Sequence, residues 1–328
     1  MRRLLVLLSA ISLCGGSLLA QLAEMNGPIE GFIFDAPTGS FRAVIGMPGS
    51  ASLGPPILDG FSRGSVAPRK DYGLAFKDGK CALVSGLGSA NATASALPGA
   101  VADPEGVVWS ANGSSAILFS RTGSWIQTIA DIPNSVTPQV SVDLSFLGAS
   151  LSAIATDTSG KRIAVGVTGE SGAVYLITDG GDPVRLLAGS TPLALAFSDD
   201  GHKLYSLDSV APRLTELQLT NLISRVLSLE GLKDPIAIKP ARDAANRPVL
   251  YVVGRNDHLL RAYDLSSYNS LTDIPLDFPP TELAEFGRNT LLIKTRNSGG
   301  DPLWLFAPTP HEAVYFVPAV PADSRGTQ

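Results

Sequence analysis

The sequence has few of the residues that build disulfides and metal sites. Its 328 residues include 2 Cys and 3 His. Cys14 lies in an apolar N-terminal run, so a chain that loses this run keeps only Cys81 and forms no intramolecular disulfide. His202, His258 and His311 stand far apart without a His or Cys partner at metal-ligand spacing, so we expect no metal site. Cys81, in KCALVSG, is interpreted as a small buried residue rather than a nucleophile.

Charge is also scarce, and the signatures of common enzymes are missing. Charged residues make up 17% of the chain, against roughly 25% in an ordinary soluble domain. The 25 basic and 30 acidic residues give a net charge of −5, which argues against nucleic acid as a partner. There is no Gly-x-Ser-x-Gly elbow, no P-loop and no Gly-rich dinucleotide fingerprint. We therefore expect no cofactor and assign no catalytic residue.

Long apolar runs are confined to the N-terminus. Arg2 and Arg3 precede the apolar stretch 4–13, and Ala20 supplies a small residue, which together form the pattern of a secretory signal peptide over 1–20. No later run approaches roughly 20 apolar residues, so we expect no transmembrane segment. The sequence predicts Sec-type export to the periplasm or to the outside of the cell.

The exported chain divides into one domain over 21–320 and a tail over 321–328. A lipid anchor on Cys14 is the less favoured alternative, because Leu13 is bulky where a lipoprotein cleavage box has a small residue. A chain near 300 residues can bury about three quarters of its unfolded surface, so a core alone can stabilise it without disulfides.

Glycine and proline are abundant, and they divide the chain into short apolar runs. The 33 Gly and 24 Pro interrupt long helices and supply turns. Six of the runs, DYGLAF, SAILFS, KRIAVG, HKLYSL, PVLYVV and NTLLIK, contain the markers Leu74, Ile117, Ile163, Leu204, Leu250 and Leu291. The markers are 43, 46, 41, 46 and 41 residues apart. This period corresponds to a four-stranded blade of a β-propeller, roughly 40–50 residues long.

Each marker run has three companions in a fixed order. In 192–230 the runs PLALAFS, HKLYSLD, RLTELQL and SRVLSLE predict four short strands separated by turns such as DDG. The apolar spacing within 214–229 would also suit one face of a helix. We favour two strands there, because the repeat requires a hairpin at this place.

The start of the chain predicts an incomplete blade. Residues 29–46 resemble the third and fourth strands of a unit without its first two, and 52–67 is predicted as an irregular connection. With six complete units, the sequence predicts an all-β propeller of seven blades whose first blade is incomplete. The alternative is a six-bladed ring with an N-terminal hairpin.

One unit resembles a known family of repeats. PVLYVVGRNDHLLRAYDLSSYNSLTDIPL resembles the YVTN-type repeats of exported bacterial β-propellers, and also NHL and WD40-like units, most clearly over 190–318. The resemblance implies the propeller fold and an exported location. Most units keep the apolar character but lack the Tyr-Val-Thr-Asn run itself. The family includes binders, scaffolds and some enzymes, so it does not give a function.

Polar residues recur just past the second strand of three units, in FSRTG, VGRND and KTRNS. We expect these turns to open onto one mouth of the central channel and to receive an anionic or carbohydrate-like ligand. The predicted patch consists of Arg121, Arg255, Asn256, Asp257, Arg296 and Asn297. The alternative is that the arginines pair with local carboxylates such as Asp257 or Asp301. TDGGDP (178–183) is interpreted as a hairpin turn rather than a calcium loop.

Three functions are compatible with this sequence. The favoured one is a monomeric, non-catalytic binding or scaffold protein that presents loops to a protein or glycan in the cell envelope or outside the cell. A second is a propeller enzyme, either a lactonase-like hydrolase or a quinoprotein-like dehydrogenase, to which FDAPTG (34–39) bears a faint likeness. The third is one module of a larger surface assembly.

Overall fold

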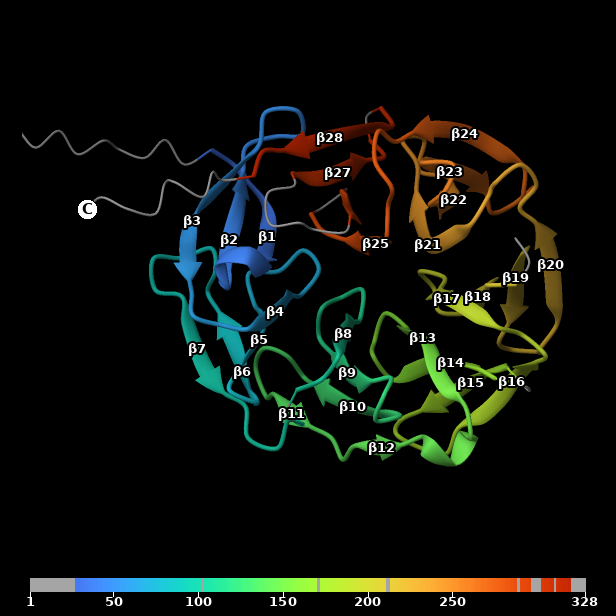
Figure 1. Cartoon of the computed structure of the whole chain (residues 1–328), viewed down its shortest axis with the longest axis horizontal. Helices are drawn as coiled ribbons and strands as arrows, with labels where there is room; N and C mark the ends of the chain where they lie inside the picture. Colours follow the sequence, from blue (N-terminus) through green and yellow to red (C-terminus); the bar gives the residue numbers. More distant parts are fainter. Residues whose placement is uncertain are drawn as a thin grey trace, which may run out of the picture.

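The described residues form antiparallel sheets arranged as a ring in the computed structural model (Figure 1). The described residues are 27–101, 103–169, 172–210, 213–287, 290–295, 302–309 and 311–319. Seven sheets follow one another along the chain, which confirms the predicted seven-bladed propeller, and the six-bladed alternative is wrong. The predicted signal peptide (1–20) and tail (321–328) lie outside the described residues.

The first four blades lie within residues 29–188. The first consists of β1 (Ile29–Asp35), β2 (Ser40–Ile45) and β3 (Ser52–Leu58), with the 3-10 turn η1 (Ala36–Thr38). The second consists of β4 (Arg63–Val66), β5 (Gly73–Lys77), β6 (Lys80–Ser85) and β7 (Thr93–Ala96). The third consists of β8 (Gly106–Trp109), β9 (Ala116–Ser120), β10 (Trp125–Ala130), β11 (Thr137–Pro138) and β12 (Val142–Asp143), followed by η2 (Ser145–Leu147). The fourth consists of β13 (Ser150–Thr156), β14 (Arg162–Thr168), β15 (Ala173–Thr178) and β16 (Val184–Ala188).

The last three blades have four strands each, and in each blade the strands follow one another from the middle of the ring to its rim (Figure 1). The fifth consists of β17 (Pro192–Phe197), β18 (Lys203–Asp208), β19 (Arg213–Gln218) and β20 (Ser224–Ser228). The sixth consists of β21 (Pro235–Arg242), β22 (Pro248–Gly254), β23 (Leu259–Asp264) and β24 (Ser270–Pro275). The seventh consists of β25 (Glu282–Glu285), β26 (Leu291–Lys294), β27 (Leu303–Ala307) and β28 (Ala313–Val317). In the described part of the chain, no helix is long and apolar enough to cross a membrane.

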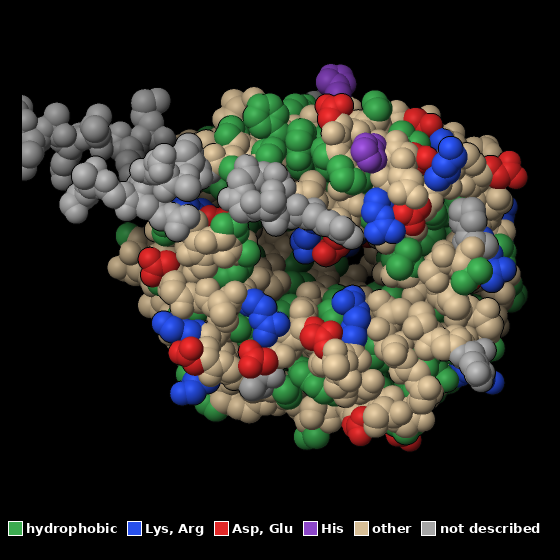
Figure 2. Space-filling view, in the orientation of Figure 1, with side chains coloured by type: hydrophobic (Ala, Val, Ile, Leu, Met, Phe, Trp, Pro, Cys, Tyr) green, Lys and Arg blue, Asp and Glu red, His purple; other side chains and the backbone are tan. Residues whose placement is uncertain are grey.

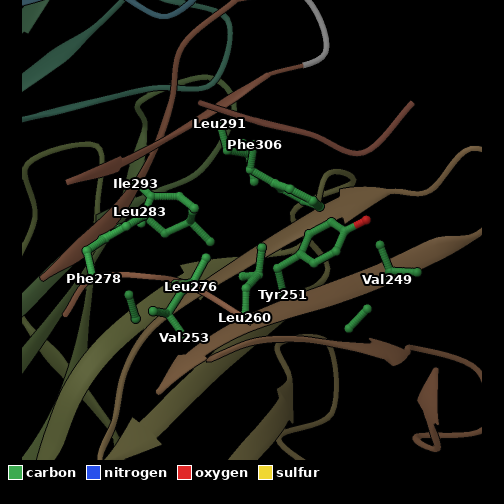
Figure 3. Close-up of a cluster of buried hydrophobic side chains, with 12 residues drawn as sticks. Val249, Tyr251, Val253, Leu260, Leu276, Phe278, Leu283, Leu291, Ile293 and Phe306 are labelled. Atoms are coloured by element: carbon green, nitrogen blue, oxygen red, sulfur yellow. The ribbon is translucent and has the colours of Figure 1, made fainter. Parts of the chain in front are cut away.

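The second strand of each complete blade contains the predicted marker residue, and in the second to sixth blades it is the most deeply buried strand of its sheet. In β22 every residue after Pro248 is buried. A sheet packed between two neighbouring sheets has no wet face at its centre, and this explains the continuous apolar runs. Figure 3 shows one such interface, where the rings of Tyr251 and Phe306 join the sixth and seventh blades at 4.9 Å.

The segment 214–229 is a hairpin, and the helical alternative is wrong. Leu214 and Leu217 of β19 are buried in the core, whereas Ile223 and Val226 are exposed. The apolar residues that could line one helix face therefore lie in different environments, because the chain turns back between them.

The first blade lacks its innermost strand. β1 starts beside the turn after β25, where Glu30 accepts a hydrogen bond from the Thr290 hydroxyl at 2.9 Å. It ends beside the start of β4, where the ring of Phe34 fills the space over Gly64. β1 is therefore antiparallel to β4 and β25. It contacts β4, the first strand of the next blade, in the same way as β14, the second strand of the fourth blade, contacts β17, the first strand of the fifth. It is the second strand of its blade, and the prediction that 29–46 forms the third and fourth strands is wrong.

The outer strand of the first blade, β3, falls within 52–67, which the sequence predicts as irregular. This prediction is wrong, since β3 pairs with β2 and β4 begins the second blade at Arg63. Pro55 and Pro56 disguise the strand, because proline cannot donate to a ladder. A strand that pairs on one side only tolerates proline on its free edge, and β3 is such a strand.

The turns between first and second strands join neighbouring blades. Gly160 has φ +79° and lies against Ser115 of the preceding blade, so a Cβ there would come within 2.3 Å of the Ser115 Cβ. Gly201, in the DDG turn of the fifth blade, has φ +68° and lies equally close to Arg162. The backbone conformation favours glycine in each turn, and at Gly160 the contact with Ser115 of the neighbouring blade requires it as well.

A charged contact closes the ring across the incomplete blade. The backbone N–H of Arg69, after β4, donates to the carbonyl oxygen of Phe286, after β25, at 3.1 Å. The Glu285 carboxylate, 9% exposed, lies 2.6 Å from the Lys239 ammonium and 3.4 Å from the Arg69 guanidinium. The Arg69 contact lacks hydrogen-bond geometry. We call Arg69, Lys239, Glu285 and Phe286 the clasp; they join the second, sixth and seventh blades.

Candidate ligand-binding site

The turn of Arg255 in the sixth blade is held by residues of its own blade. Arg255 Nε donates to the Asp234 carboxylate at 2.8 Å, and its backbone N–H donates to the Asp234 carbonyl at 3.0 Å. The backbone N–H of Lys233 donates to Asp257, and Asn256 is exposed. The expected pairing with a local carboxylate therefore exists, with Asp234 as the partner rather than Asp257.

The turn of Arg121 in the third blade leaves its guanidinium available. No described residue forms a hydrogen bond or ion pair with that group, which lies over the ring of Phe119 at 5.2 Å. Arg121 is exposed at the end of β9, where Ser120 pairs with Trp125 across the turn. An unpaired guanidinium on a fixed turn can receive a carboxylate, phosphate or hydroxyl group.

Glu105, just before β8, fixes the Arg121 turn. Its carboxylate accepts hydrogen bonds from the backbone N–H of Thr122 and the hydroxyl of Ser120, both at 2.8 Å. These hydrogen bonds, chiefly those from Thr122, lower the pKa of Glu105 to about 2. The carboxylate is therefore ionised at neutral pH, and the turn is held before any ligand arrives.

The structure does not bring the predicted patch together. Arg121 belongs to the third blade and Arg255 to the sixth, so two complete blades separate them along the shorter way around the ring. Arg296 and Asn297 lie outside the described residues. Figure 2 shows the face of the ring hollowed at its middle, with basic and acidic side chains around the hollow. The clasp supplies charged groups from three blades, but the Glu285 carboxylate is only 9% exposed and is paired within it.

A second hollow, of about 370 Å³, lies beside the Arg121 turn and was not expected from the sequence. Its walls consist of Val101, Gly123, Trp125, Ser141, Asp143 and Ser145. Trp125 and Asp143 face each other as paired residues of β10 and β12. The hollow exists because the outer side of the third blade has two short strands in place of one regular strand.

The acidic group of this hollow is ionised and fixed. Asp143 Oδ1 accepts the backbone N–H of Ser145 at 2.8 Å, and hydrogen bonding to Ser145 lowers the pKa of the carboxyl. A carboxylate, hydroxyl groups and an indole ring therefore line one space. The sequence signal for it was Trp125 directly after a turn, followed by QVSVDLS (139–145), in which polar and apolar residues alternate.

Comparisons with known proteins support the propeller fold but assign no family. No family model matches the sequence, and no curated protein matches it. The solved structure of a dihydro-heme d1 dehydrogenase, NirN, in complex with DHE is similar at 14% identity and a TM-score of 0.57, over 89% of this chain and 64% of that one. This chain thus spans less than two thirds of that dehydrogenase. A chain of a nidogen/laminin complex matches at 15% identity and a TM-score of 0.49, over 77% of this chain and 95% of that one.

At such identity the likeness to NirN shows the propeller fold alone, and the remaining sequence motifs must be judged from their own contacts. In FDAPTG the Thr38 hydroxyl donates to the Asp35 carboxylate at 2.6 Å, and the same carboxylate pairs with Arg42 at 3.0 Å. This turn is an internal network of the first blade. In TDGGDP, residues between Thr178 and Val184 form the turn of the β15–β16 hairpin, as predicted.

Proposed function

We propose that this chain is an exported, non-catalytic binding protein that presents the loops on one face of its propeller to a protein or glycan ligand. The single observation that carries the proposal is the Arg121 turn. Its guanidinium makes no polar contact with the described residues, although Glu105 holds the turn in place. An exposed guanidinium on a turn that is already fixed needs little further ordering when a ligand binds, which favours binding at this position.

The export predicted from residues 1–20 and the resemblance to YVTN-type repeats fit the same proposal. A secreted propeller meets glycans and proteins outside the cytoplasm, and its rigid ring holds loops at fixed distances. The two short strands give the outer side of the third blade an irregular shape that a regular blade lacks. Arg255, by contrast, is held by Asp234 and contributes to the structure of its own blade.

The test compares two arginines at equivalent positions. The chain from residue 21 onward is applied to a glycan array and to proteins of the native envelope fraction, as the parent and as Arg121→Ala and Arg255→Ala. We expect the parent to bind, Arg121→Ala to lose roughly tenfold or more in affinity, and Arg255→Ala to bind like the parent, because a charged hydrogen bond contributes about 1.5–3 kcal/mol. Equal binding by all three proteins would refute the proposed site at Arg121. A parent protein that binds nothing would refute the proposed function.

A further inference from the structure

The hollow beside Trp125 is lined by exposed polar side chains that retain hydrogen-bonding capacity for a ligand. Among the described residues, none accepts a hydrogen bond from the Trp125 indole N–H and none bonds to the Ser141 hydroxyl. Asp143 uses Oδ1 for the Ser145 backbone, so its second oxygen can accept from a ligand. A donor, a hydroxyl and an acceptor thus surround one aromatic ring.

The side chains of the other two tryptophans have specific partners within the fold. The indole N–H of Trp109 donates to the Ser65 hydroxyl at 2.8 Å. The ring of Trp304 stacks on Phe278 with centroids 4.2 Å apart. Trp125 makes neither a hydrogen bond nor a ring stack with the described residues; it packs at the edge of a hydrophobic cluster and lines the hollow.

Gly123 keeps the indole edge open. A Cβ at this position would lie 2.7 Å from both Cδ1 and Nε1 of Trp125, closer than any side chain can approach. A larger residue would cover the N–H or displace the ring. The glycine therefore preserves access to the donor that the fold leaves unused.

These groups together select a chemical class of ligand. A sugar ring has an apolar face of C–H groups that stacks on an indole and a rim of hydroxyls that both donate and accept. The Asp143 carboxylate requires a donor and repels phosphate, which disfavours nucleotides and phosphopeptides. The volume of about 370 Å³ is at the small end of ligand pockets, which suits one or two small rings rather than a folded partner.

We infer that the hollow between β10 and β12 binds a sugar ring, stacked on Trp125 with its hydroxyls bonded to Asp143 and Ser141. This rests on the proposed function and names its ligand: Arg121, in the adjoining turn, would contact the neighbouring unit of the same glycan. The exposed Val140 and Phe146, next to the lining residues in sequence, extend apolar surface along the rim.

The test follows tryptophan fluorescence during titration with methyl glycosides of glucose, galactose, mannose, N-acetylglucosamine and glucuronic acid, with choline as a cationic probe. The proteins are the parent, Gly123→Ala, Asp143→Asn, Trp125→Phe and the control Trp304→Phe. Gly123→Ala retains every ligand-contacting side chain and either covers the indole N–H or displaces the ring, so it tests the hollow even where Trp125→Phe folds poorly.

We expect at least one glycoside to change the emission of the parent and of Trp304→Phe with equal affinity. The signal should disappear in Trp125→Phe, and affinity should fall about tenfold in Gly123→Ala and Asp143→Asn. A response to choline alone, or a glycoside response that survives in Trp125→Phe, overturns the inference. If no glycoside is bound while the array still shows binding that depends on Arg121, the inference fails and the proposed function stands; if both are negative, both fail.

Discussion

The backbone N–H of Arg69 donates to the carbonyl oxygen of Phe286 at 3.1 Å, and this bond joins the second blade to the seventh. The first blade lies between these two in the ring but has no innermost strand to separate them. The residues that follow the C-terminal ends of β4 and β25 therefore meet directly. Glu285 adds ion pairs to Arg69 and Lys239 at the same place. The ring is complete although one of its blades is not.

Loss of the clasp carboxylate should weaken the whole ring. Glu285→Ala removes the partner of two cations, which we expect to cost about 2 kcal/mol of the free energy of unfolding. Glu282→Ala on the same strand is the matched control, because its pair with Lys294 is half exposed and contributes at most about 1 kcal/mol. Urea unfolding measures both values. Equal costs would show that the buried pair has no special part in closure.

The turn glycines can be tested with a pair of identical substitutions. Gly160→Ala and Gly180→Ala both place alanine at positive φ, +79° and +72°, which costs about 1–2 kcal/mol. Only Gly160 has a neighbour in the way, since nothing lies within 4 Å of a Cβ at Gly180. We expect a further loss of about 1–3 kcal/mol for Gly160→Ala in thermal unfolding. A similar loss for both would contradict the contact between blades.

Acid should release the Arg121 turn. In the folded chain the pKa of Glu105 is about 2, lowered from 4.5, so the unfolded chain binds the proton more readily. The hydrogen-bonded Glu105 carboxylate therefore contributes its full stability above about pH 4.5. This contribution should disappear as the pH falls from 4.5 towards 2. Acid unfolding of the parent and Glu105→Gln measures it: the difference in stability should be full at pH 6 and shrink below pH 4.5. A difference that does not change with pH would refute the assignment.

Cys81 should be unreactive until the chain unfolds. It is buried, and burial raises the pKa of its thiol to about 12, so the reactive thiolate is rare at neutral pH. We expect a thiol reagent at pH 8 to label Cys81 at the rate of unfolding, and to label it fully in urea. Rapid labelling of the native protein would show that the hollow near Phe61 and Lys80 gives access to the sulfur.

The repeat of apolar runs was sufficient to predict six complete blades and the second strand of each, because strands and turns are local features of sequence. The seventh blade was predicted from the additional strands at 29–46. The role of β1 was not predictable in this way. Its position follows from contacts with Thr290 and Gly64, which are remote in sequence. β3 was missed because Pro55 and Pro56 resemble a break.

The candidate site was predicted only in part. Arg121 and Arg255 were both correctly placed on the turn after a second strand. The partner of Arg255, Asp234, was not predicted, because it lies 21 residues earlier in the sequence, before β21. The hollow at Trp125 depends on the pairing of β12 with β10, and no short stretch of sequence encodes that pairing.

The most direct test of the ring closure is amide hydrogen exchange at Arg69. This N–H lies in a turn, where an amide without a partner exchanges quickly, but here it bonds to Phe286 of a blade more than 200 residues away in sequence. We predict protection comparable to that of the strands β5 and β22, and a marked loss of protection in Glu285→Ala. Exchange of the parent's Arg69 amide at the rate of an unstructured peptide would contradict a ring closed between the second and seventh blades.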